Sequence, residues 1–204
     1  MYHCRVPPAL RIIRKSSFTP KPWKNGGGVT HEALRMPADG EAFACRVSVA
    51  HIDASGPFSD FAGYQRNMVL LKGEGLSLKF ADGSERSLKR VGDLAQFDGA
   101  LAPDCTLFAG PCVDLNLMVA KAHAAVAGVE WLAGSKGRNA RAARAESTLM
   151  FGIDAALVVT IDATTLVLEP WDLGVLSNGS AQVRLLDPRA AANPSAVFFA
   201  TISH

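Results

Sequence analysis

The sequence has little excess charge of either sign and lacks the segments that mark several function classes. It carries 21 basic and 19 acidic residues, a net charge of +2, and this balance gives no footprint for nucleic acid or an anionic membrane surface. No apolar run approaches the roughly 18 to 20 residues that span a bilayer. The N-terminal stretch lacks the continuous apolar segment of a signal peptide. We therefore expect a cytoplasmic protein that binds neither nucleic acid nor a membrane.

Patterns typical of disulfides and metal sites are also missing. The four cysteines form no Cys-x-x-Cys pair, and the apolar surroundings of Cys45 and Cys105 are typical of buried, reduced thiols. None of the five histidines is two residues from another, whereas a metal site in a small β-barrel would need a His-x-His strand with a later carboxylate. Arg66 falls where such ligands would lie, and its guanidinium would repel a cation. We expect neither a metal nor another cofactor.

Motifs for phosphate binding and nucleophilic catalysis are absent as well. Residues 25–30 lack the spacing of a P-loop. Ser48 and Ser59 have no recognisable histidine partner in sequence. No catalytic residue is assigned.

Short strands with regular turn punctuation dominate the chain, and no long helical period interrupts them. Alternation is cleanest in two segments, 43–52 and 113–119. Further strands are expected at 10–13, 67–71, 76–80, 94–97, 106–109, 156–161, 166–169, 183–186 and 196–203. The pattern predicts an all-β fold, an antiparallel sandwich or small barrel, with two β-rich halves that suggest two related barrels.

Polar side chains share one face of each alternating strand. Arg46 and Ser48 project together from the first, and Asp114 and Asn116 from the second, while the opposite faces are apolar. Inward polar groups need partners, because an unpaired buried group costs about 1–3 kcal/mol. A pocket for an anionic, amide-bearing ligand would supply them, since arginine can take a carboxylate by two parallel bonds. An internal Arg46–Asp114 salt bridge that fixes Asn116 is the structural alternative.

A run of three glycines, 26–28, follows Trp23, Lys24 and Asn25. Glycines in a row contribute no side chain to a core, so their use is conformational. At least one should have positive φ or lie against a closely approaching group. The neighbouring aromatic, cationic and amide side chains indicate binding chemistry on a loop.

The segment 134–145 breaks the strand pattern because it is polar, basic and low in bulky residues. It predicts a solvated connector. We accordingly divide the chain into residues 1–119, which carry the pocket motifs, and residues 120–204, a degenerate second half with the connector at about 134–146.

Several unusual sequence words occur in order over residues 20–119 and together resemble the HutD/Ves family. They are Pro22-Trp23-Lys24-Asn25-Gly26-Gly27-Gly28-Val29-Thr30-His31-Glu32, Arg46-Val47-Ser48, residues 56–66 (GPFSDFAGYQR), and Gly110-Pro111 leading to residues 114–118 (DLNLM). The resemblance implies a cupin-type barrel, bicupin in organisation, without the metal-ligand set. The expected ligand-binding residues are Trp23, Lys24, Asn25, Gly26, Gly27, Arg46, Ser48, Phe58, Gln65, Arg66, Asp114 and Asn116.

The same resemblance implies an association with histidine utilisation, in which the protein senses or limits pathway flux. A pathway acid such as formylglutamate, formiminoglutamate or urocanate is the implied ligand, and a homodimer is left open. The less favoured alternatives are a metal-free isomerase or hydrolase acting on a small carboxylic or formamido acid, a Ves-like stress-related protein, and an interaction module that uses the basic connector. For catalysis the chain offers Glu32, His51 and Asp114 as titratable groups but no obvious pair.

Overall fold

The structure, a computed structural model, describes residues 9–23, 26–38, 42–123, 125–132, 137–186 and 195–203. Within these ranges the helices are two short 3-10 turns, η1 (Lys15–Ser17) and η2 (Gly99–Leu101). None of the described helices has the length and apolarity needed to cross a membrane. The remaining regular structure is β-strand in antiparallel sheets, which confirms the all-β prediction.

The chain packs into two compact units. The N-terminal unit is Ser17–Ala124, and the C-terminal unit is Ala125–His204 together with Met1–Ser16. This division differs from the expected ranges at the N-terminus. The reason is a long-range pairing in which β1 (Ala9–Ile13) lies antiparallel to β16 (Leu173–Leu185), with Ala9 opposite Ser177.

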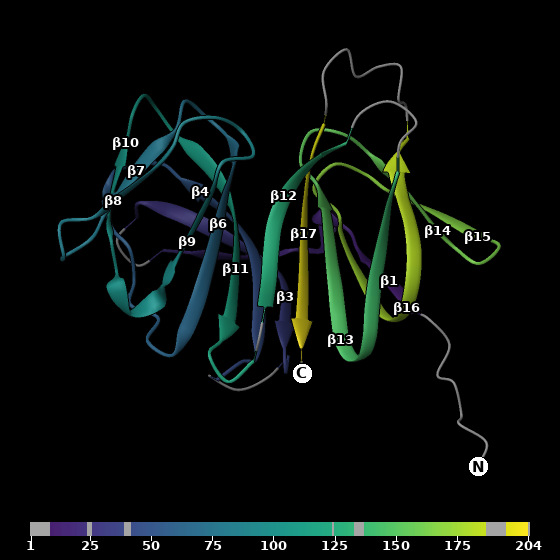
Figure 1. The fold of residues 1–204 in the computed structure, drawn as a ribbon. Helices are drawn as coiled ribbons and strands as arrows, with labels where there is room; N and C mark the ends of the chain where they lie inside the picture. The colour runs from purple at the N-terminus through teal and green to yellow at the C-terminus, as the bar shows by residue number, and fades with distance from the viewer. Residues whose placement is uncertain are drawn as a thin grey trace. The chain divides into compact units, whose positions relative to one another are not determined.

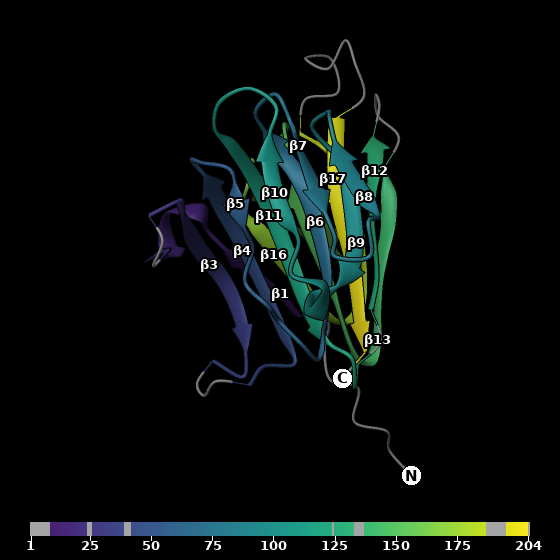
Figure 2. The same cartoon turned by 90° about the vertical axis from the view of Figure 1, so that its left-hand side faces the viewer.

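The N-terminal unit contains two antiparallel sheets (Figure 1). The larger sheet has the order β2 (Thr19–Pro22), β3 (Gly28–Met36), β4 (Cys45–Ile52), β11 (Cys112–Ala120), β6 (Tyr64–Lys72) and β9 (Leu94–Asp98). The smaller sheet has the order β5 (Gly56–Pro57), β10 (Asp104–Leu107), β7 (Leu76–Lys79) and β8 (Glu85–Leu88). Figure 2 shows the long strands β4, β11 and β6 of this unit side by side.

One apolar core joins the two sheets of this unit. Ile52, Met68 and Leu70 of the larger sheet pack in the same cluster as Leu78 and Cys105 of the smaller sheet. Each fully buried aliphatic side chain contributes roughly 1.5–3 kcal/mol relative to exposure. The core occupies one end of the inner face, because the same faces of β4, β11 and β6 carry polar residues further along the strands.

The C-terminal unit is built on a single seven-stranded sheet (Figure 1). Its order is β12 (Ala125–Leu132), β17 (Ser195–Ser203), β13 (Arg138–Gly152), β16, β14 (Leu157–Ile161) and β15 (Thr164–Leu168), with β1 paired to β16. Its core is apolar and includes Leu157, Leu176, Val183 and Phe199.

The predicted connector at 134–145 is wrong where the structure describes it, because residues 138–145 belong to β13. Ala140 and Ala142 are buried while Arg141 is exposed, so the segment alternates like any strand. Arg141 lies at an outward position of this alternation, and the density of basic residues in the sequence made the stretch look solvated. Small alanines give a weak hydrophobic signal even when they point into a core.

The cysteines that the structure describes, Cys45, Cys105 and Cys112, are free and buried. Burial raises the pKa of the Cys45 and Cys105 thiols to about 12. The prediction of buried reduced thiols at these two positions is confirmed.

Candidate functional site

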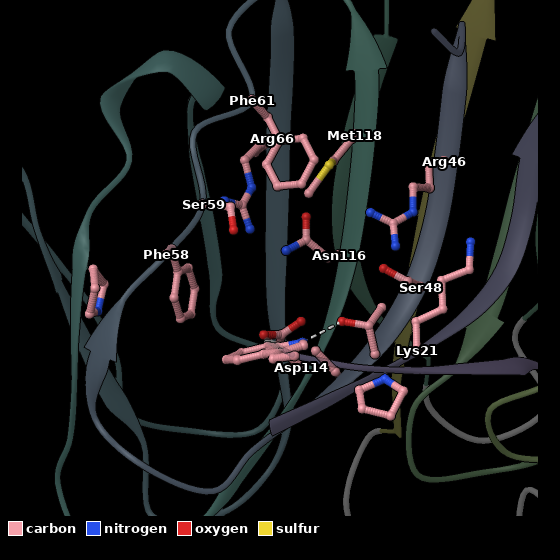
Figure 3. A pocket seen from close by; sticks show the side chains of 15 residues that line it. Lys21, Arg46, Ser48, Phe58, Ser59, Phe61, Arg66, Asp114, Asn116 and Met118 are labelled. Atoms are coloured by element: carbon pink, nitrogen blue, oxygen red, sulfur yellow. Dashed lines mark hydrogen bonds between the residues drawn. The ribbon is translucent and has the colours of Figure 1, made fainter. Parts of the chain in front are cut away.

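A cavity of about 490 Å³ opens into the polar end of the N-terminal unit's inner face (Figure 3). Its walls come from β2, β3, β4, β5, β6 and β11 and from the loop after β5. The lining residues are Lys21, Pro22, Trp23, Thr30, Arg46, Ser48, Ala50, Pro57, Phe58, Ser59, Phe61, Arg66, Asp114, Asn116 and Met118.

Strand register brings the polar side chains of the cavity together. Met118 of β11 lies opposite Arg46 of β4 on one side and opposite Arg66 of β6 on the other. Two residues along β11, Asn116 lies opposite Ser48. Because the side-chain period of a strand is two, these residues share one face of the sheet. In Figure 3, Asn116 accordingly lies between Arg66 and Arg46.

Arg66 is a buried cation with unused donors. Its side chain is 3% exposed, and its Nε and Nη1 atoms have no hydrogen-bond partner among the described residues. The guanidinium carbon lies 5.5, 5.5 and 5.0 Å from the ring centroids of Phe58, Phe61 and Phe97, and contacts of this kind are attractive. Burial lowers the pKa of Arg66 to about 10 while Asp114 opposes the change, so the group stays charged at neutral pH.

Asp114 and Asn116 add unused acceptors to the same cavity. Asp114 is 1% exposed, and Oδ1 of each residue lacks a partner among the described residues. Burial raises the pKa of Asp114 to about 7, against the opposing effect of Arg66. Buried polar groups are nearly always hydrogen-bonded, and each exception in a native fold calls for an explanation. A ligand with both acceptors and donors would satisfy all three residues.

Arg46 pairs with Glu32 and not with Asp114, so the structural alternative raised from the sequence is wrong. Arg46 Nε donates to Glu32 Oε2 at 2.7 Å, and Lys21 Nζ donates to Glu32 Oε1 at 2.8 Å. Burial alone would raise the pKa of Glu32, but the bonds from Lys21 and Arg46 outweigh it and lower the pKa. The trio leaves one net positive charge beside the cavity.

The glycine run is required for its backbone conformation and for close packing against β4. Gly26 has φ +71°, which confirms the prediction of positive φ in this run. At Gly28 an added Cβ would lie 2.2 Å from the carbonyl oxygen of His51, so only glycine fits against β4. The turn positions Trp23, whose Nε1 donates to Thr30 Oγ1 at 2.8 Å.

The structure brings most of the predicted site residues together. Those that line the cavity are Trp23, Arg46, Ser48, Phe58, Arg66, Asp114 and Asn116. Gly26 and Gly27 lie in the turn and not in the lining. Gln65 is also outside the lining, because it neighbours Arg66 on β6 and so projects from the opposite face. Lys24 and Asn25 lie outside the described residues.

Sequence reasoning missed Lys21, and it offered Glu32 only as a titratable group and not among the ligand-binding residues. The register Lys21–Thr30 and Glu32–Ser48 places both on the cavity face. The alternation of β3 could have indicated this, but the glycines before it concealed the strand. Phe61, Ser59 and Met118 were likewise not assigned to the site.

The cavity does not fit the metal that many cupin barrels hold. Within the described ranges there is no group of three His, Cys, Asp or Glu side chains able to hold an ion. His31 and His51 lie in edge contact, 5.3 Å between ring centroids, but on the face of β3 and β4 away from the cavity. The unpartnered donors of Arg66 would face a cation with a like charge.

Two curated relatives match part of the chain. The chain is 39% identical over 112 residues, 54% of its length and 58% of the relative's, to an uncharacterized 21.2 kDa protein in the hutC 3' region of Pseudomonas putida. It is 35% identical over 97 residues, 47% of its length, to protein Ves of Citrobacter koseri, covering 50% of that protein. The chain thus spans about half the length of the curated relatives it matches.

Solved structures match more completely. A conserved protein of unknown function from Pseudomonas aeruginosa PAO1 has a TM-score of 0.83 and 30% identity, with 96% of this chain and 100% of that chain covered. HutD from Pseudomonas fluorescens SBW25, solved in a formate condition, has a TM-score of 0.76 and 26% identity over the same shares.

The fold is also that of more distant proteins. Oxalate decarboxylase of Bacillus subtilis covers 94% of this chain at a TM-score of 0.64, over 76% of its own length, with 8% identity. Such neighbours confirm the cupin-type fold, and the bicupin organisation stays a prediction. A model of the HutD family matches residues 15–192, and the chain therefore belongs to the HutD family.

Proposed function

We propose that the cavity of the N-terminal unit binds a small carboxylic acid without a metal, and that the chain acts in histidine utilisation as a regulatory, flux-limiting binding protein. One observation carries the proposal: a buried, charged Arg66 has two nitrogen donors with no partner among the described residues. Arginine and carboxylate form two parallel, charge-assisted bonds, and these are among the strongest available to proteins.

The second positive site favours an acid with two charged groups. Arg46 and Lys21 flank the cavity from β4 and β2, and their shared carboxylate, Glu32, neutralises only one of them. Asn116 lies between the two arginines (Figure 3) and can take an amide or formamide group. Formylglutamate carries two carboxylates and a formamide, so it matches these groups in number and kind.

The context of relatives supports the same pathway. One relative lies beside hutC in Pseudomonas putida, and one structural neighbour is named HutD and was solved in formate. Formate is the smallest carboxylate, and a site that takes a larger acid at a guanidinium would also accept it.

A second candidate function is a metal-free isomerase or hydrolase of the same cavity. It is favoured by Asp114, since a buried carboxyl whose pKa is about 7 can give and take protons near neutral pH. Proton NMR of formylglutamate and urocanate incubated with the protein separates the two functions. Unchanged spectra over many hours support binding alone, and conversion of either acid supports the enzyme.

Calorimetric titration tests the binding function. Formylglutamate, urocanate and glutamate are titrated into the wild type and into Arg66→Met with a chelator present. We expect Arg66→Met to bind the best of these acids about 10- to 150-fold more weakly, the loss of one charge-assisted bond of about 1.5–3 kcal/mol.

The matched control is Arg86→Met, because Arg86 is an exposed arginine on β8 outside the cavity lining. It should bind like the wild type. Equal affinity in wild type and Arg66→Met, or binding that disappears with the chelator, would contradict the proposal.

A further inference from the structure

We infer that a carboxylate enters this cavity together with a proton, which Asp114 accepts. The inference rests on the proposed function, because it requires a carboxylate at Arg66. It assigns to Asp114 a specific role in selecting the ligand's charge, beyond lining the cavity.

Arg66 and Asp114 carry opposite charges that act on each other in the cavity, and Arg46 also acts on Arg66. Arg66 and Asp114 lie on adjacent strands, β6 and β11, and both side chains are almost completely buried. Nε and Nη1 of Arg66 and Oδ1 of Asp114 have no hydrogen-bond partner in the described part of the chain. The charge of Arg66 therefore acts on Asp114 through the cavity, where no bond locks the two groups together.

A bound carboxylate changes this balance. It would accept the free donors of Arg66 and place a second negative charge near Asp114. Two carboxylates in one buried site cannot both stay ionised easily, so the pKa of one of them rises strongly. The pKa of Asp114 is already about 7 because of burial, and so Asp114 is the carboxyl that takes the proton.

The proton comes from solvent and forms the O–H bond of the Asp114 carboxyl, with no other bond made or broken. The protonated group becomes a donor as well as an acceptor. It can then donate to the ligand, whereas an ionised Asp114 would repel it.

The other titratable groups considered around the cavity do not titrate in the same range. Arg66 stays charged, since its pKa is about 10. Glu32 is held ionised by Arg46 and Lys21, which lower its pKa overall despite its burial. The Cys105 thiol on β10 stays neutral, because burial, with contributions from Asp114 and Cys112, raises its pKa to about 12.

The direction of the pH dependence follows from these signs. Below the pKa of Asp114 in the free protein, the proton is present before and after binding, and affinity is flat. Above it, each binding event must take up a proton, and affinity falls by up to about tenfold per pH unit. Asp114→Asn resembles the protonated state. Its affinity should stay flat across the whole pH range, and binding should take up no proton.

The experiment is calorimetric titration of formylglutamate from about pH 5.5 to about pH 9, a range in which its own carboxyl groups stay ionised. Each pH is measured in two buffers of different ionisation enthalpy, so that the difference in heat reports protons taken up. For the wild type we expect flat affinity at the acid end, a fall of up to about tenfold per pH unit above about pH 7, and uptake of up to about one proton.

The control is His51→Gln. His51 lies on the opposite face of β4, and burial, His31 and Lys72 lower its pKa while Asp53 raises it. This variant should keep the pH dependence of the wild type, and Asp114→Asn should lose it. If Asp114→Asn does not fold, carbon-13 NMR can follow the titration of the Asp114 carboxyl in the wild type, with and without formylglutamate. Saturation with formylglutamate should raise the pH at the midpoint of this titration.

The outcomes separate the two ideas. Wild type that binds no carboxylate at any pH overturns the proposed function. Wild type that binds equally well across the range, with equal heats in both buffers, overturns the proton uptake alone. Loss of the pH dependence in His51→Gln would place the proton on the histidine and also overturn the assignment to Asp114.

Discussion

The two units of the chain use antiparallel sheets of the same kind but fill their interiors differently. In the C-terminal unit the core is apolar, with Leu157, Leu176 and Val183 completely buried. In the N-terminal unit the core is apolar at one end only, and the cavity face of β4, β6 and β11 carries Arg46, Ser48, Arg66, Asp114 and Asn116. The difference lies in a few inward positions, which line a cavity with polar side chains.

That difference has an energetic consequence. The described part of the chain contains four buried side-chain atoms without partners, and all of them belong to Arg66, Asp114 and Asn116. Each unsatisfied group costs about 1–3 kcal/mol. The C-terminal interior satisfies its buried Asp172, which accepts bonds from the backbone N–H groups of Lys15 and Glu169. The N-terminal interior leaves its groups without partners among the described residues, and the proposed ligand would supply them.

Leu176→Ala should give the largest effect and should separate stability from binding. Leu176 is completely buried in the C-terminal core, and removing such a side chain costs about 2–5 kcal/mol. Urea unfolding followed by circular dichroism should show this loss, while the affinity for formylglutamate measured under native conditions stays unchanged. A parallel loss of affinity would contradict the idea that the C-terminal core supports stability while the N-terminal cavity binds the ligand independently of it.

The double substitution Arg66→Met, Asp114→Leu makes the N-terminal interior resemble the C-terminal one. Replacing a buried charge pair by apolar side chains of similar volume is often neutral or stabilising by about 1–4 kcal/mol. We expect unchanged or increased stability in urea, together with loss of detectable carboxylate binding. A large loss of stability would mean that the pair holds the unit together and is not reserved for a ligand.

Arg46 should contribute less to ligand binding than Arg66, because Arg46 Nε already donates a hydrogen bond to Glu32. Arg46→Ala should weaken formylglutamate binding by about 1.5 kcal/mol, the lower end for a charge-assisted bond. Arg46→Lys should recover only part of this, since an ammonium lacks the planar fork of a guanidinium. Calorimetry that finds both variants equal to wild type would leave Arg46 a structural partner of Glu32.

Gly26→Ala should have the smallest effect. The added Cβ meets nothing within 4 Å, so only the positive φ opposes it. Strain of this kind costs about 1 kcal/mol. We expect a stability loss of that size in urea, with a mild loss of affinity through the displaced Trp23. A neutral result in both measurements would remove the conformational argument for this glycine.

Local alternation predicted the centre of the site and little beyond it. The pairs Arg46–Ser48 and Asp114–Asn116 are two residues apart on their strands, so the period of two was enough to place each pair on one face. The register Asn116–Ser48 then brought the pairs together. The prediction of an all-β, antiparallel fold rested on the same local signal.

The rest depends on contacts that are distant in sequence. The pairing of β1 with β16 joins Ala9 to Ser177, and no local pattern indicates it. The strand at Arg138 was hidden because its inward residues are alanines. Glu32 was not expected to pair with Arg46, since β3 follows a glycine run that masks its alternation.

The most direct measurement is a crystal structure of the protein with formylglutamate. The account predicts one carboxylate of the ligand at Arg66, its two oxygens accepting bonds of about 2.8 Å from Nε and a terminal nitrogen. It also predicts the ligand's remaining polar groups beside Asn116 and Arg46. A ligand bound outside the cavity, or bound inside it with the Arg66 donors still unpaired, would contradict the central claim.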